Sequence, residues 1–325
     1  MIKYSFIIPV KEINDYIRES VPKILEIKRD DFEVIIYPDV ANGEKWAKTT
    51  QISTGSVGPA EKRTLAIRDA KGDFFVFIDD DAYPNGDFLD ILDKDFEDKE
   101  TAAVGGPAIT PKTDSFWQKV SGAVFLSSLS CGFPERYVSI GKKREVTDWP
   151  SVNLSVRRAD FVTVHGFNSK YWPGEDTLFC LDLIKKTHKK ILYDPDLVVF
   201  HHRRSGLGRH LWQICQYGLH RGFFAKQFPE TSFKLRYFIP SLFVLFILAG
   251  LFAYDFGRSF LILYGIGWFV YLLALVKAFW DIHKYEKNIW IGLNVVYYIC
   301  FTHIFYGLAF IKGFLFTKEL KSRLR

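Results

Sequence analysis

The sequence has little cysteine and no dense basic stripe. Its four cysteines show neither the spacing of a metal site nor a paired framework (Cys131, Cys180, Cys215 and Cys300). This pattern argues against a disulfide-stapled secreted scaffold and favours a reducing compartment. Basic residues form no stripe before residue 200 and the net charge is only +6, so no nucleic-acid partner is expected. An apolar strand begins at Tyr4, and we therefore expect no signal peptide.

Aromatic residues are abundant, and many lie in long apolar segments after residue 230. The chain has 31 Phe, 16 Tyr and 8 Trp. Three segments, 237–254, 259–280 and 289–311, are each long enough to cross a hydrocarbon core of about 30 Å at about 1.5 Å per residue. Tyr and Trp gather near the segment ends, as interface anchors do. The sequence predicts a multi-pass membrane protein, with three buried helices of a soluble protein as the alternative.

Basic residues indicate how these segments are oriented. Lys226, Lys234 and Arg236 precede the first segment, and further charges lie between the second and third, whereas the first connection holds only Asp255 and Arg258. This asymmetry places the amino-terminal domain on the cytoplasmic side. A basic tail follows the third segment (Lys312, Lys318, Lys321, Arg323 and Arg325). If all three segments span, this tail lies outside. The sequence leaves open whether the third segment spans, is re-entrant or lies in the interface.

The amino-terminal part alternates strands and helices. Apolar runs at 4–10, 32–37 and 74–78 are typical of buried strands, and helical patterns cover 16–25 and 60–72. The order β-α-β-α-β predicts an α/β, doubly wound, mainly parallel sheet with right-handed crossovers.

Three acids, Asp79-Asp80-Asp81, directly follow the apolar run 74–78. Ending a buried strand in three carboxylates is costly unless a cation lies beside them. A hard divalent cation, Mn²⁺ or Mg²⁺, prefers such oxygen ligands and commonly also holds phosphate. Ligands of open α/β sheets bind beyond the carboxyl ends of the strands, which is where these acids fall. A solvated acidic loop is the alternative.

Several motifs together resemble family 2 glycosyltransferases, which are inverting enzymes with the GT-A fold. In chain order they are Ile7-Ile8-Pro9-Val10, the strand ending at Asp39, the helix 60–72, the DXD-like Asp79-Asp80-Asp81, Trp149 to Arg158, and Gly166-Phe167-Asn168 followed by Gly174-Glu175-Asp176. The resemblance covers residues 4 to 225. It implies a nucleotide-diphosphate sugar as donor and a divalent metal as cofactor. A Gln-x-x-Arg-Trp motif is missing, which argues against a processive polymer synthase.

The resemblance also implies roles for individual residues. The metal is expected on Asp81, with His201 completing the site and Asp80 supporting it. Asp79 is expected either to bind the metal as well or to hold the ribose of the donor. Asp176 is the expected catalytic base, aided by Glu175, although an acidic pair at a helix start is also a common cap. The expected donor-binding residues are Pro9 and Val10 at the nucleobase, Glu12 near the ribose, Asp39 at the base, and Lys62 and Arg63 near the phosphates. Trp149 and Trp172 are candidates for stacking on a sugar.

A basic segment, residues 200–210, separates the predicted domains. Its Arg203, Arg204 and Arg209 suit either lipid headgroups or a phosphate ligand. We expect a catalytic domain over 1–205, an amphipathic interfacial helix over 206–235, with Trp212 and Phe223 on its apolar side, and a transmembrane region over 236–325. An ordinary packed helix is the alternative for the middle segment.

The predicted function is transfer of a sugar to a polyprenyl-linked glycan in surface polysaccharide or glycoconjugate assembly. Two alternatives remain: a polyprenyl-phosphate sugar synthase, whose acceptor is the lipid phosphate itself, and an inactive membrane-anchored binding protein. The identity of the sugar and of the nucleotide is not specified by these motifs.

Overall fold

The computed structural model describes residues 1–130, 133–252 and 254–320. It divides into two compact units, one formed by Met1–Pro111 with Val138–His202 and the other by Lys112–Tyr137 with Arg203–Arg325. Cys131 and the tail residues Lys321, Arg323 and Arg325 lie outside the described residues. The predicted division at residues 205 and 235 stays a prediction, and the structure adds that 112–137 groups with the carboxyl-terminal helices.

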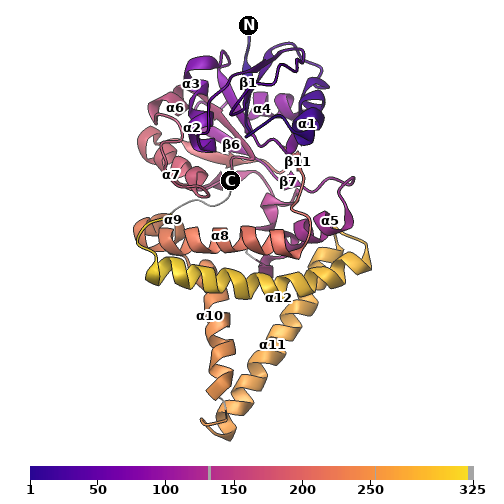
Figure 1. Cartoon of the computed structure of the whole chain (residues 1–325), viewed down its shortest axis with the longest axis vertical. Coiled ribbons are helices and arrows are strands. Elements are labelled where there is room, and N and C mark those ends of the chain that lie inside the picture. Colours follow the sequence, from indigo (N-terminus) through magenta and orange to yellow (C-terminus); the bar gives the residue numbers. More distant parts are fainter. Residues whose placement is uncertain (131–132, 253, 321–325) are drawn as a thin grey trace. The chain divides into compact units, whose positions relative to one another are not determined.

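The first unit is built on a mixed sheet in which parallel pairs predominate (Figure 1). In spatial order the described strands are β3 (Thr49–Gln51), β2 (Phe32–Tyr37), β1 (Tyr4–Pro9), β4 (Phe74–Ile78), β9 (Asn153–Arg157), β6 (Thr101–Gly105), β10 (Lys190–Tyr193) and β8 (Arg144–Val146). Only β9 and β8 run antiparallel to their neighbours in this sheet. This is the predicted mainly parallel α/β sheet.

Helices cover both faces of this sheet because side chains alternate between the faces along each strand. Phe6 and Ile8 of β1 pack with α1 (Asp15–Leu25) and α4 (Phe88–Asp95) on one face. Ile7, between them, packs on the other face with α2 (Pro59–Thr64), α3 (Ala66–Asp69), α6 (Arg158–Thr163) and α7 (Glu175–Thr187). The single helix predicted over 60–72 is broken into α2 and α3 at Leu65.

A small second sheet fixes the position of the acids that follow β4. It consists of β5 (Ala82–Pro84), β11 (Val199–His201) and β7 (Ala108–Ile109). β5 begins directly after Asp81, and its Ala82 is paired in register with His201. The segment from Ile191 to Phe200 is not one strand: β10 and β11 belong to different sheets, and a turn at Asp194 separates them.

The second unit is helical. Its helices are α5 (Phe116–Ala123), α8 (Leu207–Gln227), α9 (Pro229–Ser232), α10 (Leu235–Ala249), α11 (Arg258–His283) and α12 (Ile289–Ile311), with short turns η1 (Val124–Leu126), η2 (Ser128–Ser130), η3 (Pro134–Arg136), η4 (Gly250–Phe252) and η5 (Lys312–Phe316). Among the described residues, three helical segments are long and apolar enough to cross a membrane: Leu235–Phe252, Arg258–His283 and Ile289–Phe316.

α8 and α12 lie side by side, and both cross the direction of α10 and α11 (Figure 1). Their backbones approach closely at glycines: a Cβ added at Gly218 would lie 2.6 Å from the carbonyl oxygen of Tyr306, and one at Gly222 would collide with that of Phe310. The buried side of α8 carries small and polar residues beside Ile214, Phe223 and Phe224. The Trp212 side chain is 49% exposed and Phe223 is buried, and the interfacial role predicted for this helix stays a prediction.

Candidate active site

Two carboxylates and an imidazole converge where β4 ends. Nε2 of His201 lies 3.1 Å from Oδ1 of Asp81. One potential ligand atom from each of Asp79, Asp81 and His201 lies within 4.8 Å of the other two. Carboxylate oxygens with one imidazole form a donor set that suits Mn²⁺ or Mg²⁺. The residues predicted to hold the metal are thus brought together, with His201 contributed by β11 from far along the chain.

The adjacent histidines have different partners. His202 pairs through Nε2 with Oε2 of Glu19 at 3.2 Å, and its ring packs on Tyr16 at 5.1 Å between centroids. Both partners belong to α1. His202 is thereby directed toward α1, while His201 faces Asp81.

Asp80 differs from the acids on either side of it. Its Oδ2 accepts a hydrogen bond from Nδ2 of Asn14 at 2.7 Å. Burial and the neighbouring Asp81 carboxylate raise the pKa of Asp80 to about 7, against the effect of that hydrogen bond. Asn14 also caps α1, since its Oδ1 accepts from the backbone N–H of Ile17 at 2.9 Å. No role for Asn14 was predicted from the sequence, and its side chain ties the start of α1 to the acid run.

Arg63 joins the acid run to the start of α7. Its guanidinium donates from Nη2 to Oδ1 of Asp79 at 2.7 Å and from Nη1 to Oε1 of Glu175 at 3.1 Å. The residue is only 3% exposed. Both partners of Arg63 here are protein carboxylates, and its predicted place near the donor phosphates stays a prediction.

Glu175 and Asp176 occupy the first turn of α7 but differ in environment. Glu175 is buried, and burial together with the adjacent Asp176 raises the pKa of its carboxyl to about 8, with Arg63 opposing the shift. Asp176 is partly exposed, and its Oδ1 accepts from the backbone N–H of Thr177 at 2.8 Å. Of this pair, Asp176 is the carboxylate that a substrate can reach, and Glu175 is the one held by Arg63.

Lys62 ties together the ends of β1 and β2. Its ammonium group donates to the carbonyl oxygen of Val10 at 2.6 Å and forms an ion pair with Asp39. Lys62 is buried and holds Asp39 at this strand end, and its predicted place near the phosphates stays a prediction. Pro9 and Val10 are buried at this strand end, and Glu12 is exposed just beyond it.

Three consecutive residues of α2 thus reach three parts of the site. Besides Lys62 and Arg63, the hydroxyl of Thr64 accepts from the backbone N–H of Phe167 at 3.0 Å. The ring of Phe167 also lies 5.5 Å from the guanidinium of Arg63. α2 therefore orders the strand ends, the acids and the loop before α7.

Trp149 does not have the sugar-stacking role suggested for it. It is 2% exposed, its Nε1 donates to the carbonyl oxygen of Gly106 at 2.9 Å, and its ring packs on Tyr193. Trp172 is partly exposed, and its suggested contact with a sugar stays a prediction.

Replacing Arg63 by Met should destabilise the first unit by about 1–3 kcal/mol, because the buried Glu175 loses its hydrogen-bond donor and Asp79 loses an ion pair. The matched variant is Arg68→Met, which removes an exposed arginine paired with Asp69 and should lower Tm far less. Thermal unfolding of the purified variants compares them. If both lower Tm equally, Arg63 does not hold the site together. Adding Glu175→Gln to Arg63→Met should recover part of the loss.

Comparison with known proteins identifies the class. Residues 5–153 match the sequence model of glycosyl transferase family 2. This match bears out the resemblance drawn from the motifs: the first unit carries a glycosyl transferase family 2 domain and has the GT-A fold. The chain is a glycosyltransferase with a carboxyl-terminal region of apolar helices.

Particular relatives extend this picture. The chain is 23% identical over 253 residues to the dolichyl N-acetyl-alpha-D-glucosaminyl phosphate 3-beta-D-2,3-diacetamido-2,3-dideoxy-beta-D-glucuronosyltransferase of Methanococcus voltae, covering 76% of this chain and 72% of that one. It is 30% identical over 102 residues to the poly(ribitol-phosphate) beta-N-acetylglucosaminyltransferase TarS of Staphylococcus aureus, covering 27% of this chain but only 18% of that relative. The solved mannosyltransferase PcManGT of Pyrobaculum calidifontis, in complex with GDP-Man and Mn²⁺, has a similar fold. Its TM-score is 0.55 at 15% identity, covering 98% of this chain and 88% of that one.

Proposed function

We propose that this protein transfers a sugar, with inversion, from a nucleotide-diphosphate donor to a polyprenyl-linked acceptor at a membrane. The observation that carries the proposal is the cluster of Asp79, Asp81 and His201 at the end of β4, joined through Arg63 to the acids of α7. A divalent cation held by this cluster would supply countercharge for the departing nucleoside diphosphate. The intact cluster argues against an inactive binding protein.

The acceptor side of the reaction falls to Asp176. An acceptor hydroxyl must lose its proton as it attacks the anomeric carbon, and a carboxylate at the reaction site can take that proton. Asp176 is the accessible carboxylate of the pair, because Glu175 is buried against Arg63. A lipid phosphate as acceptor is already anionic near neutral pH and needs no such base.

A lipid-linked acceptor is supported by two independent observations. The relative from Methanococcus voltae is a transferase named for a dolichyl-linked phosphosugar, and this chain has apolar helices of membrane-spanning length. The donor and the metal are supported by PcManGT, which was solved with both GDP-Man and Mn²⁺ bound. The polyprenyl-phosphate sugar synthase keeps its place as second candidate because exposed arginines, Arg204 and Arg209, precede and begin α8.

The packing of α12 bears on how the chain meets the membrane. α8 contacts α12 through the His210–Thr302 hydrogen bond, at 2.9 Å, and Lys226 Nζ of α8 donates to the carbonyl oxygen of Thr317, just after η5, at 2.7 Å. Moving α8 into the hydrocarbon core of a membrane would be energetically unfavourable. The helix carries many polar or charged residues, among them Arg209, His210, Gln213, Gln216, His220, Arg221 and Lys226. Each Arg or Lys at the bilayer centre costs about 2.5–3.5 kcal/mol. If α12 spanned the bilayer, it would take α8 in with it.

We therefore assign only α10 and α11 as spans, joined as a hairpin, and place α12 with α8 in the membrane interface. The hairpin is held together by aromatic contacts, among them Phe243 with Tyr271 at 4.3 Å and Phe246 with Tyr264 at 4.7 Å. With two spans, Lys318 lies on the same side as Lys234 and Arg236. The conflict of the basic tail with the cytoplasmic placement of charge then disappears.

Labelling of single introduced cysteines tests this topology. Lys287→Cys, before α12, and Lys318→Cys, after it, should react with an impermeant maleimide from the same side of sealed vesicles. Asp255→Cys, in the hairpin turn, should react from the opposite side. All three positions are exposed. Labelling of positions 287 and 318 from opposite sides would show that α12 spans.

The proposed activity is tested with the full-length protein in membranes, supplied with Mn²⁺, a panel of nucleotide sugars and extracted polyprenyl lipids. We expect nucleotide release from one donor to rise when the lipid is added, together with a glycosylated lipid product. Binding of nucleotide sugars without any release or product would favour the inactive binding protein instead.

A further inference from the structure

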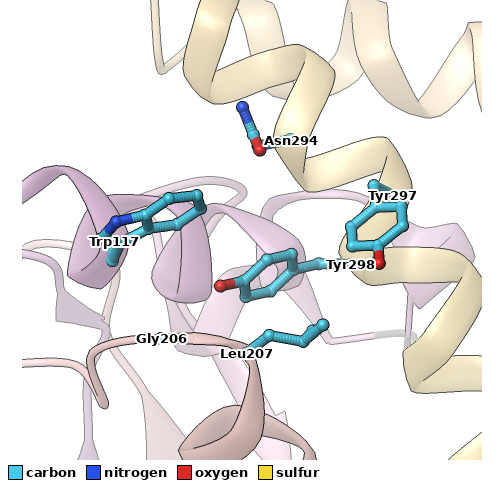
Figure 2. A pocket seen from close by; sticks show the side chains of 6 residues that line it. All are labelled: Trp117, Gly206, Leu207, Asn294, Tyr297 and Tyr298. Carbon is cyan, nitrogen blue, oxygen red and sulfur yellow. The ribbon is translucent and has the colours of Figure 1, made fainter.

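A cavity of about 300 Å³ lies within the helical unit. It is bounded by three elements: α5, the start of α8 and α12 (Figure 2). The lining residues are Trp117, Gly206, Leu207, Asn294, Tyr297 and Tyr298. Its volume is at the lower end of the range of roughly 300–1,000 Å³ typical of small-molecule sites.

The walls of the cavity are apolar and aromatic. The rings of Trp117 and Tyr298 lie nearly parallel, with centroids 6.4 Å apart, and Leu207 lies beside Tyr298 (Figure 2). Tyr298 is 2% exposed, whereas Trp117 and Tyr297 are about half exposed, at 46% and 53%. Asn294 donates its side-chain N–H to the carbonyl oxygen of Trp290 at 2.9 Å, within its own helix. The surface offered to a ligand is therefore an open hollow of ring faces and aliphatic groups.

A buried histidine holds the three walls together. His210 lies one helical turn after Leu207 and is fully buried. Its Nδ1 is 2.9 Å from the hydroxyl of Ser121 in α5, and its Nε2 is 2.9 Å from the hydroxyl of Thr302 in α12. Burial lowers the pKa of His210 to about 4, so the ring stays neutral at physiological pH. The hollow is thus built into the fold by a hydrogen-bonded tie and is not a chance gap between loose helices.

Two exposed arginines lie close in the chain to lining residues of the cavity. Arg204 precedes Gly206 by two residues, and Arg209 follows Leu207 by two; both side chains are exposed. Within the described part of the chain, neither has a hydrogen-bond or ion-pair partner. Arg203 differs from them, because its side chain is buried and its guanidinium lies 5.0 Å from the ring of Tyr137. The lipid-phosphate role suggested for all three arginines therefore falls to Arg204 and Arg209.

An apolar hollow, with two exposed arginines within two residues of its lining in the chain, is complementary to an amphiphile with an anionic head and a hydrocarbon chain. Arginine suits phosphate oxygens, and aromatic faces suit a branched, unsaturated chain. The hollow belongs to the helices that we place in the interface, where lipid phosphates lie.

We propose that this cavity binds the phosphate-proximal hydrocarbon units of the polyprenyl acceptor, with Arg204 and Arg209 holding its phosphate. The proposal rests on the proposed function and deepens it, since it names the surface that selects the lipid. Leu207, Trp117, Tyr297 and Tyr298 would then determine acceptor specificity without taking part in the chemical step.

Binding is tested without turnover, using geranylgeranyl phosphate as the probe and native mass spectrometry of the full-length protein in detergent. Leu207→Trp should fill the hollow and weaken retention by about tenfold or more, since the apolar contacts are lost. The matched control is Leu293→Trp, an exposed position on α12 outside the lining, which should change retention less than about twofold. Arg204→Ala with Arg209→Ala should reduce binding of the phosphate to the level of geranylgeraniol.

The arms of the experiment separate the possible ligands. Inorganic phosphate should not compete with the probe, because the hollow contributes no contact to it. Phosphatidylglycerol should compete weakly. Equal competition by phosphatidylglycerol would show a general lipid-headgroup surface and overturn the proposal, as would equal retention by Leu207→Trp and Leu293→Trp.

Failure of this inference is distinguishable from failure of the proposed function. The first is read from lipid retention by the variants, and the second from product formation by the unaltered protein. Transfer by the unaltered protein together with unchanged retention in Leu207→Trp would place the lipid elsewhere while leaving the proposed function intact. Selective retention without transfer from any donor would leave the lipid site standing and remove the enzymatic proposal.

Discussion

Replacing Asp81 by Asn is expected to reduce sugar transfer by more than about 100-fold. Substitution of residues that only hydrogen-bond to a metal ligand already costs about 10–100-fold in activity, and Asp81 is a predicted ligand itself. Asp81 lies at the end of β4 within reach of His201 and Asp79, and its loss removes one of three potential ligands. The first unit should still fold, because Asp81 is part of neither core cluster found among the described residues of that unit. Initial rates measured against Mn²⁺ concentration, with Tm as the control for folding, give the effect.

The adjacent acid supplies the matched control. Asp80 bonds to Asn14 and is absent from the metal-type cluster. Asp80→Asn should therefore retain far more activity than Asp81→Asn, with little change in the Mn²⁺ dependence. Equal losses would mean that the acid run acts as a whole, and undiminished transfer in excess chelator would show that the reaction needs no metal.

Asp176→Asn is expected to lower transfer to a hydroxyl acceptor by about 10²–10⁴-fold, the usual contribution of a general base. Donor affinity should remain nearly unchanged, because the base acts on the acceptor. Calorimetry with the nucleotide sugar and initial rates with the lipid acceptor measure the two quantities separately.

The comparison with Glu175→Gln distinguishes a base from a structural acid. Glu175 is buried against Arg63, so Glu175→Gln should alter stability and the position of Asp79 as well as the rate. If Asp176→Asn also weakens donor binding, Asp176 is a structural cap of α7. A loss of only about tenfold would be too small for a base, and would favour a lipid phosphate as the acceptor.

Local sequence patterns were sufficient to predict the strands that position the site residues. The runs 32–37 and 74–78 were predicted at their observed bounds, because unbroken apolar residues ending in acids or proline have few other structural solutions. The place of Asp79 and Asp81 followed from the rule that ligands bind beyond the carboxyl ends of parallel strands.

The partners of buried charges could not be predicted in the same way. Arg63 is separated from Glu175 by 112 residues, and nothing in the local pattern around a lysine–arginine pair distinguishes a buried bridge from a phosphate ligand. The consecutive residues Lys62, Arg63 and Thr64 were the available signal, since three polar side chains in one short helix reach different directions. The same limit applies to Trp149, whose hydrogen bond to Gly106 depends on the folded sheet.

The carboxyl-terminal helices show the limit of predicting membrane spans from composition alone. Length and hydropathy qualify α12 as a span as fully as α10 and α11. What separates α12 from them is its polar neighbour α8, which lies some 80 residues earlier in the chain and contacts it through Gly218 and Gly222. Our proposal that α12 lies in the interface therefore rests on a tertiary contact, which hydropathy does not register.

Metal-dependent transfer from a nucleotide sugar to a lipid-linked acceptor is tested most directly by product formation. The full-length protein would be placed in bilayer nanodiscs containing a polyprenyl-linked acceptor, and the lipid would be measured by mass spectrometry with and without Mn²⁺. We predict a lipid heavier by one sugar, formed only with metal and lost in Asp81→Asn. Formation of the same product at an equal rate without metal, or by Asp81→Asn, would contradict this prediction.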